Sequence, residues 1–495
     1  MKTVLRSMNL GSSVAEFDNS LEQYFVENEA FYALIGDQAD IVAGDKGTGK
    51  SALYRIIQKR YAEIEELAGV DIVSGFNPVG SPIFQRLVQQ PAMTEGQYSS
   101  VWKTYFLSLL GNWLLTSYPD NNSENFKSLD RLLRETGLRS KDNKPETIFG
   151  KIAGFVQRVL IPQTAEVEMT ISETGLPIVT PKLTFGKTKD DDTAEEVRHE
   201  EALALLNSCL EETGRSAWIV MDRLDEAFQG FPNVEVPALR ALFRTYLDLF
   251  AFSHFRLKLF VRRDLFRKII AGGFVNLSHI NARKIEILWD DADLMNLLCR
   301  RARDNHQLIK HIGAEDSSDE DLFYKLFPPK VDQAARKPTT WKWMLARIKD
   351  GNEIKPPRNL IDLATFAQEE QARMEARTPR QYTGTEPLMT ADAVRKSQER
   401  LSAQRVTDTL LAEAGPVISP LIEKFRRSKA EHNLETLKGV LGLTDAPLKD
   451  AVQQLTEVGF LEELKSTWKV PMLYRDGLDI TQGKAFSNEV EDEDE

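Results

Sequence analysis

The feature that most constrains the fold is the stretch GDKGTGKS at residues 44–51, which has the pattern G-x-x-x-x-G-K-S. A short apolar run at residues 40–43 precedes it, and Leu53, Ile56 and Ile57 recur at helical spacing after it. Strand, glycine-rich loop and helix thus follow in the order that a phosphate-binding loop requires. Glycines let the backbone wrap a phosphate, so that N–H groups and the helix N-terminus face its negative charge.

The roles within this loop follow from the chemistry of each residue type. Lys50 is expected to reach the β- and γ-phosphates of a nucleotide, and Ser51 is expected to ligate Mg²⁺. ATP and Mg²⁺ are therefore the expected cofactors. The residues expected to bind the nucleotide are Gly44, Asp45, Lys46, Gly47, Thr48, Gly49, Lys50 and Ser51.

The second half of such a site is an apolar strand that ends in an acid, and SAWIVMDRLDE at residues 216–226 matches it. The apolar run at residues 218–221 indicates a buried parallel strand, and Asp222 follows at its carboxyl end, where α/β sheets place their ligands. Asp222 is the expected outer-shell Mg²⁺ ligand. Glu226 is the first choice for the residue that polarises the attacking water and Asp225 is the second. The alternative for both is a solvated loop acid.

Two further arginine positions are candidates for sensing the nucleotide. The strand LKLFVRRD at residues 257–264 ends in Arg262 and Arg263, and either could sense the γ-phosphate or reach a neighbouring subunit. Arg263 is the choice, with surface ion pairing as the alternative. Arg358 follows Pro356 and Pro357 at a helix start, where an arginine is unfavourable without an anionic partner. This favours Arg358 as a sensor from a helical lid over a surface arginine.

Composition limits the class of protein. A length of 495 residues predicts about three domains, and a hydrophobic fraction of 42% allows real cores. The two cysteines, Cys209 and Cys299, form no disulfide framework or zinc spacing, which fits a reducing cytoplasm. The N-terminus lacks the apolar run of a signal peptide, and no run of about 18 apolar residues predicts a membrane span. The net charge of −12 argues against a protein that coats nucleic acid, but leaves room for a local basic face.

The order of the segments predicts an α/β core followed by helical domains. The core is expected at residues 1–290, with inserted helices and a hairpin at about 120–200. The hairpin is either decoration of the sheet or a partner contact. A helical lid (291–374), a linker rich in Pro, Gly and Thr (375–392), a winged-helix-like domain (393–482) and an acidic tail (483–495) follow.

The winged-helix-like segment is expected to contact either a protein or DNA. Its second helix, with a predicted buried stripe of Leu448, Val452, Leu455 and Val458, would be the one to read DNA. The polar residues of that helix are not basic, and the densest basic patch lies elsewhere in the segment. A protein contact is therefore favoured over DNA. The patch comprises Lys424, Arg426, Arg427 and Lys429.

With these residues in place, the chain resembles the STAND and KAP-like P-loop ATPases, which are relatives of the AAA+ initiator ATPases. The segments GDKGTGKSAL, IVMDRLDEAF, LKLFVRRDLF, IEILWDDADLMNLLCRRA and PPRNLIDLA occur in the family's order, and the similarity covers roughly residues 15–480. The family includes stand-alone members with a C-terminal winged helix that occur in bacterial antiphage defence loci. Arg223 is a departure, since many STAND proteins carry a small residue there and KAP proteins an acid. Its role stays open.

The resemblance implies an α/β P-loop NTPase core of the AAA+/STAND type and an ATP-binding and ATP-hydrolysing molecular switch. It implies an oligomeric, slow, regulatory ATPase of a bacterial antiphage defence system that senses a trigger or controls an effector. A homo-oligomer and a protein effector or sensor are the expected partners; nucleic acid is less favoured, and no membrane is expected. The alternative is an AAA+ initiator-like DNA-binding ATPase in replication or transposition, and a third reading is a nucleotide-locked scaffold without turnover.

Overall fold

The computed structural model falls into two compact units. We call Glu27–Asp45 with Lys50–Ile287 the sheet unit, and Met1–Val26, Lys46–Gly49 and Leu288–Glu495 the helical unit. Each is described by itself. The residues described are 5, 8–76, 93–140, 169–171, 177–179, 183–184, 196–224, 226, 232–382 and 384–486.

The sheet unit is built on a five-stranded sheet in which every pairing is parallel. Its central strands are continuous apolar runs, as expected of parallel strands that are covered on both faces. Ile41, Val42 and Ala43, for example, are fully buried. The order across the sheet is β2 (Val70–Phe76), β7 (Ser216–Met221), β8 (Phe255–Arg262), β1 (Ile41–Gly44) and β9 (Lys284–Glu286).

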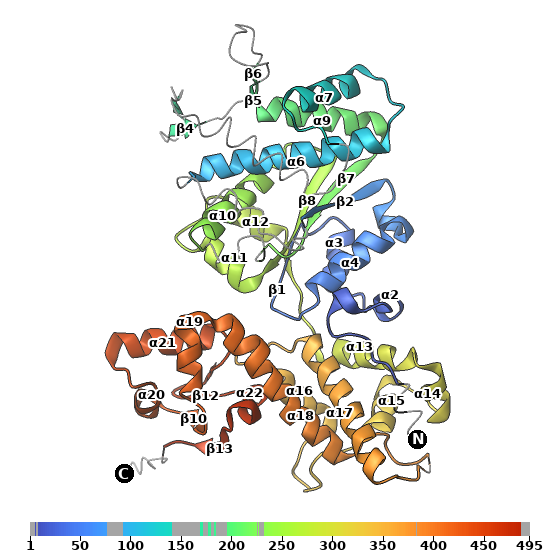
Figure 1. Cartoon of the computed structure of the whole chain (residues 1–495), viewed down its shortest axis with the longest axis vertical. Helices are drawn as coiled ribbons and strands as arrows, with labels where there is room; N and C mark the ends of the chain where they lie inside the picture. Colours follow the sequence, from blue (N-terminus) through green and yellow to red (C-terminus); the bar gives the residue numbers. More distant parts are fainter. Residues whose placement is uncertain are drawn as a thin grey trace, which may run out of the picture. The chain divides into compact units, whose positions relative to one another are not determined.

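Helices cover both faces of this sheet (Figure 1). On one face, Ile219 and Met221 pack into a core with α6 (Glu95–Ser117), α9 (His199–Thr213) and α10 (Pro232–Leu249). Trp102 links two of these helices, because its indole N–H donates to the Ala238 carbonyl at 2.8 Å.

On the other face, α3 (Glu29–Ile35) and α4 (Lys50–Arg60) contact the strands. The ring of Tyr54 on α4 lies edge-on to the ring of Phe260 on β8, with centroids 5.8 Å apart. The expected fold class, an α/β P-loop NTPase core with a parallel sheet between layers of helices, is confirmed.

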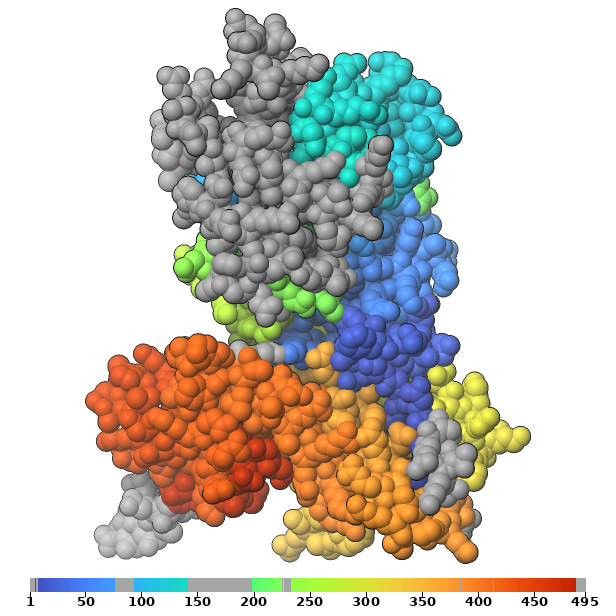
Figure 2. Space-filling model, in the orientation of Figure 1, coloured from blue at the N-terminus to red at the C-terminus, as the bar shows by residue number. Residues whose placement is uncertain are grey.

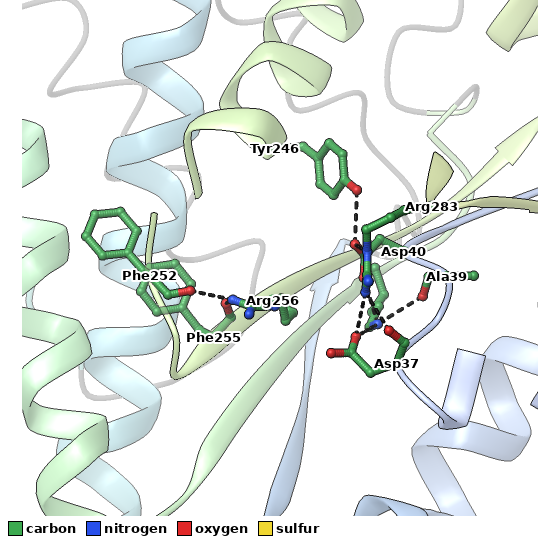
Figure 3. A network of polar contacts seen from close by, with 9 residues as sticks. Asp37, Ala39, Asp40, Tyr246, Phe252, Phe255, Arg256 and Arg283 are labelled. Carbon is green, nitrogen blue, oxygen red and sulfur yellow. Dashed lines mark hydrogen bonds and ion pairs between the residues drawn. The ribbon is translucent and has the colours of Figure 1, made fainter. Parts of the chain in front are cut away.

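A cluster of buried charges lies at the start of β1 (Figure 3). Asp40 is fully buried and accepts hydrogen bonds from Lys258 at 2.7 Å, from Tyr246 at 3.0 Å and from Arg283. The carboxylate of Asp37 also forms ion pairs with both Lys258 and Arg283. Burial alone would raise the pKa of Asp40, but the hydrogen bond from Arg283 and the charge of Lys258 outweigh it and lower that pKa. The cluster therefore stabilises the fold at neutral pH, and this contribution is lost as pH falls through the lowered pKa.

The helical unit has its own core, which includes Leu5, Met8 and Leu10 from the start of the chain. Gln368 ties that N-terminal segment down by donating to the Met8 carbonyl at 2.8 Å. The core helices before the C-terminal domain are α13 (Asp291–Arg303), α14 (His306–His311), α15 (Asp319–Leu326), α16 (Thr340–Ile348), α17 (Pro357–Arg377) and α18 (Ala391–Arg405).

The segment between α17 and α18 is shorter and better packed than the linker expected at residues 375–392. Helix α17 runs to Arg377, α18 starts at Ala391, and both Leu388 and Met389 are fully buried. The composition of this stretch reveals its Pro, Gly and Thr residues, but it does not reveal that Leu388 and Met389 pack into a core.

A π-helical segment, Val406–Leu411, connects α18 to the C-terminal domain. This domain is coloured orange to red in Figure 2. Its small sheet has the order β11-β12-β10-β13. Along the chain the domain comprises a helix, a strand, two helices, two short strands, a short helix and a final strand, β13. They are α19 (Ala412–Glu423), β10 (Lys429–His432), α20 (Leu434–Leu441), α21 (Asp445–Glu457), β11 (Glu462–Glu463), β12 (Trp468–Lys469), α22 (Met472–Arg475) and β13 (Thr481–Lys484).

The buried stripe expected on α21 holds for three of its four residues. Leu448, Val452 and Leu455 are buried. Val458 is 37% exposed because the helix has already ended at Glu457, so that the helical spacing no longer applies to it.

At the position of the expected hairpin, β3 (Met169–Ile171) and β4 (Pro177–Val179) pair antiparallel, and β5 (Leu183–Thr184) pairs with β6 (Glu196–Val197). Most of the expected acidic tail, residues 487–495, lies outside the described residues. No helix in the described part of the chain has the length and apolar character that crossing a membrane requires.

We predict that Lys258→Met opens the sheet locally, because it leaves the buried carboxylate of Asp40 with one fewer cation. Breaking a buried ion pair costs about 3–5 kcal/mol. Hydrogen exchange of the amides in β1 and β8 should report a fall of this size in the opening free energy.

Arg256→Met is the matched control for this prediction. Arg256 also lies on β8, but its guanidinium donates to the backbone carbonyls of Phe252 and Phe255 and lies over the ring of Phe250, 5.9 Å from its centroid. About 1 kcal/mol is expected for its loss. If the amides of β1 and β8 were equally protected from exchange in the two variants, the charge cluster would not stabilise the sheet more than an ordinary hydrogen bond does.

Candidate functional site

The loop between β1 and α4 has the backbone of a phosphate cradle. Gly47 has φ +78° and Gly49 has φ +104°, in the left-handed region where a residue with a Cβ is strained. Gly49 is the second glycine of the G-x-x-x-x-G-K-S pattern, and Gly47 is an additional glycine between the two that the pattern specifies. The backbone N–H groups of such a loop and of the following helix start favour an anion.

Lys50 and Ser51 open helix α4 and lie at the carboxyl edge of the sheet. The ammonium of Lys50 donates to the carbonyls of Gly44 at 2.8 Å and Asp45 at 2.9 Å. The Ser51 hydroxyl donates to the Asp222 carboxylate at 2.7 Å, across 171 residues of sequence. The parallel sheet thus brings together the loop and the acid that the sequence assigned to one site.

The pair of oxygens from Ser51 and Asp222 fits Mg²⁺. Both are hard ligands, and Mg²⁺ is usually held by one or two protein oxygens while water and phosphate supply the rest. Asp222 is only 3% exposed. Burial raises its pKa, and the Ser51 hydroxyl, the backbone N–H of Arg223 and the charges of Lys50 and Arg223 only partly offset this. A buried carboxylate that is short of positive charge is a good partner for a divalent cation.

Arg263 lies beside the loop of its own chain. Its guanidinium contacts Glu286 at 2.8 Å and Asp45 at 3.4 Å, and its side chain is only 17% exposed. Arg262 instead makes two hydrogen bonds to Asp264, at 3.1 and 2.9 Å. Arg263 contacts the loop residue Asp45 and is held by carboxylates of its own chain, while Arg262 pairs with Gly44 across the strands.

Arg358 belongs to the helical unit, as does the loop tip Lys46–Gly49. A Cβ placed on Gly47 would come within 3.1 Å of the Cβ of Arg358, so the glycine also permits this close approach. The Nε of Arg358 is buried without a hydrogen-bond partner. Burial lowers the pKa of Arg358, and the nearby charge of Arg405 lowers it further.

Trp289 is a contact that sequence reasoning missed. Its indole N–H donates to the Thr48 carbonyl at 2.7 Å, and it immediately precedes Asp290, the N-cap of α13. The available signal was a large aromatic residue at a strand-to-helix junction.

The two candidate bases follow Asp222 closely. Glu226 has a side chain that is 44% exposed, and one of its oxygens lies 3.6 Å from the guanidinium of Arg223. Asp225 lies outside the described residues. Arg223 has φ +58°, a left-handed conformation that is uncommon for a residue other than glycine.

Comparison with known proteins gives weak similarities. No family model matches the chain. An 80.3 kDa protein of Escherichia coli (strain K12), which its name assigns to the transposon gamma-delta, is 23% identical over 307 residues, which are 60% of this chain and 40% of that protein. The chain therefore matches only about two fifths of the length of this curated relative.

Solved structures with a similar course of the chain include three archaeal proteins. The ORC1 protein of Aeropyrum pernix, solved with DNA, is 12% identical, covers 94% of this chain and 96% of its own, and has a TM-score of 0.35. The ORC2 protein of Aeropyrum pernix, in ADPNP–ADP complexes, is 12% identical, and the match covers 93% of this chain and 97% of that protein, with a TM-score of 0.40. A Walker-type ATPase of Pyrococcus abyssi is 10% identical, and the match covers 96% of this chain and 100% of that protein, with a TM-score of 0.40. Such values are too low to transfer a function to this chain.

We predict that Lys50→Ala weakens ATP binding about tenfold to a hundredfold, because a charge-assisted hydrogen bond contributes about 1.5–3 kcal/mol. Titration calorimetry with ATP and Mg²⁺ measures this directly. Lys59→Ala, an exposed lysine on the same helix, is the matched control and should bind as the wild type does. An unchanged dissociation constant for Lys50→Ala would remove the loop from nucleotide binding.

Proposed function

We propose that this chain is a Mg²⁺-dependent ATPase that acts as a molecular switch. The observation that carries the proposal is the 2.7 Å hydrogen bond between the Ser51 hydroxyl and the Asp222 carboxylate, beside Lys50 at the carboxyl edge of the sheet. Lys50 binds the β- and γ-phosphates, and Ser51 and Asp222 hold Mg²⁺, which neutralises phosphate charge when bound. Glu226 takes the proton of the attacking water at its carboxylate, with Asp225 as the second choice.

The switch character is supported by contacts of the loop tip within the helical unit. Trp289 binds the Thr48 carbonyl at 2.7 Å, and Arg358 packs against Gly47. A change in the loop backbone on nucleotide binding would reach α13 and α17 through these two side chains. Arg358 is then the residue that relates nucleotide state to the lid helix, and Arg263 is the sensor at the other side of the loop.

The biological role proposed first is a component of a bacterial antiphage defence system. In this role the chain forms a homo-oligomer with ATP and controls a protein effector or senses a trigger. The support for it is the resemblance of the motifs to stand-alone STAND and KAP-like ATPases, together with Arg358 near the start of a helix in the lid.

The second candidate is a DNA-binding ATPase of replication or transposition. Two observations favour it: the order of elements in the C-terminal domain suits a winged helix, and the curated relative is named for a transposon. The exposed face of α21 weighs against DNA, since its one lysine, Lys449, is accompanied by Asp450 and Glu457.

We predict that wild-type protein releases phosphate from ATP and that Glu226→Gln lowers the rate by about a hundredfold or more, as expected for a lost general base. Glu211→Gln, an exposed acid on α9, is the control and should leave the rate unchanged. Lys50→Ala supplies the background. Equal rates for wild type and that background would indicate a nucleotide-locked scaffold instead of an ATPase.

A DNA-binding measurement separates the two biological roles. For the first role, we expect duplex DNA to show no anisotropy change at physiological salt, with or without ATP. Nanomolar binding that weakens steeply with added salt would favour the second role, because the release of counterions from phosphates gives that dependence.

A further inference from the structure

We infer that Arg223 is a positioning residue that restrains Glu226, so that turnover requires the two side chains to separate. The inference rests on the proposed ATPase function. It gives a role to the position at which this chain departs from the family it resembles.

The backbone of this segment forms a tight turn that brings the two side chains together. The N–H of Glu226 donates to the Arg223 carbonyl at 3.0 Å, which is the bond between the first and fourth residues of a turn. The guanidinium of Arg223 then lies 3.6 Å from a carboxylate oxygen of Glu226. The ion pair is thus a product of the turn that directly follows Asp222.

Arg223 occupies this turn at a conformational cost. Its φ of +58° is left-handed, a region that costs a residue with a Cβ about 1–2 kcal/mol, while glycine and, to a lesser degree, asparagine tolerate it. Strain of this kind at a functional site is consistent with a side chain that is kept for what it does.

The ion pair bears on the chemistry because a base must present its oxygen to water. The carboxylate oxygen that faces Arg223 lies 3.6 Å from a cation, which competes with water for that oxygen. The two side chains are 26% and 44% exposed, so the pair is weak, worth about 0.2–1 kcal/mol. It can be broken in each turnover, and it tunes the rate rather than blocking it.

The test uses the full chain with Arg223→Asn, which removes the charge but keeps a residue that tolerates left-handed φ. We expect kcat for phosphate release to rise about 1.4- to fivefold, because this is the rate equivalent of the pair's stability. The KM for ATP should stay within about twofold of wild type, and Arg223→Lys, which keeps the charge, should return kcat toward wild type. In a Glu226→Gln background, Arg223→Asn should change nothing.

Several results would overturn the inference. A lower kcat for Arg223→Asn would mean that the arginine supports the transition state, and an unchanged kcat would mean that it only shapes the turn. A rise that persists in the Glu226→Gln background would show that Glu226 is not its target. Wild-type turnover against the Lys50→Ala background reports separately on the proposed function: no turnover there overturns both, whereas normal turnover with any of the former results overturns this inference alone.

Discussion

Asp40 is bound from both sides by the strands that flank β1. Its backbone N–H donates to the Arg283 carbonyl at 2.8 Å, its carbonyl accepts from Leu259 at 2.7 Å, and its carboxylate is bound by Lys258 and Arg283. A slip of one residue would turn every side chain of the strand to the opposite face. It would also leave buried charges unpaired, which costs several kcal/mol. The register of β1 between β8 and β9 therefore depends on this cluster.

The register of β1 also determines which residues come together at its carboxyl end. Because the strands are parallel, the carboxyl ends of β1 and β7 lie along one edge of the sheet even though β8 separates them. The loop after β1 then leads into Ser51, and the end of β7 leads into Asp222, at hydrogen-bond distance from each other. The charge cluster and the candidate site are thus coupled through the rigidity of one short strand.

The loop also has a second set of contacts, and the proposed switch depends on them. Lys50 and Ser51 belong to the sheet unit, and the tip Lys46–Gly49 groups with the helical unit. There Trp289 and Arg358 lie against it. These contacts involve the Thr48 carbonyl and the glycines Gly47 and Gly49.

By itself the sequence determined the fold class, the glycine-rich loop and the acid-ending strand, because a continuous apolar run, a glycine spacing and a helical stripe are local patterns. Tertiary structure alone decided the rest. The contacts of Asp40, Trp289 and Arg223 depend on strand register, on the packing of a loop or on a left-handed turn, and none of these leaves a periodic trace in the chain. The same holds for the packed segment before α18. Proximity between residues far apart in sequence is a property of packing, and local pattern carries no information about it.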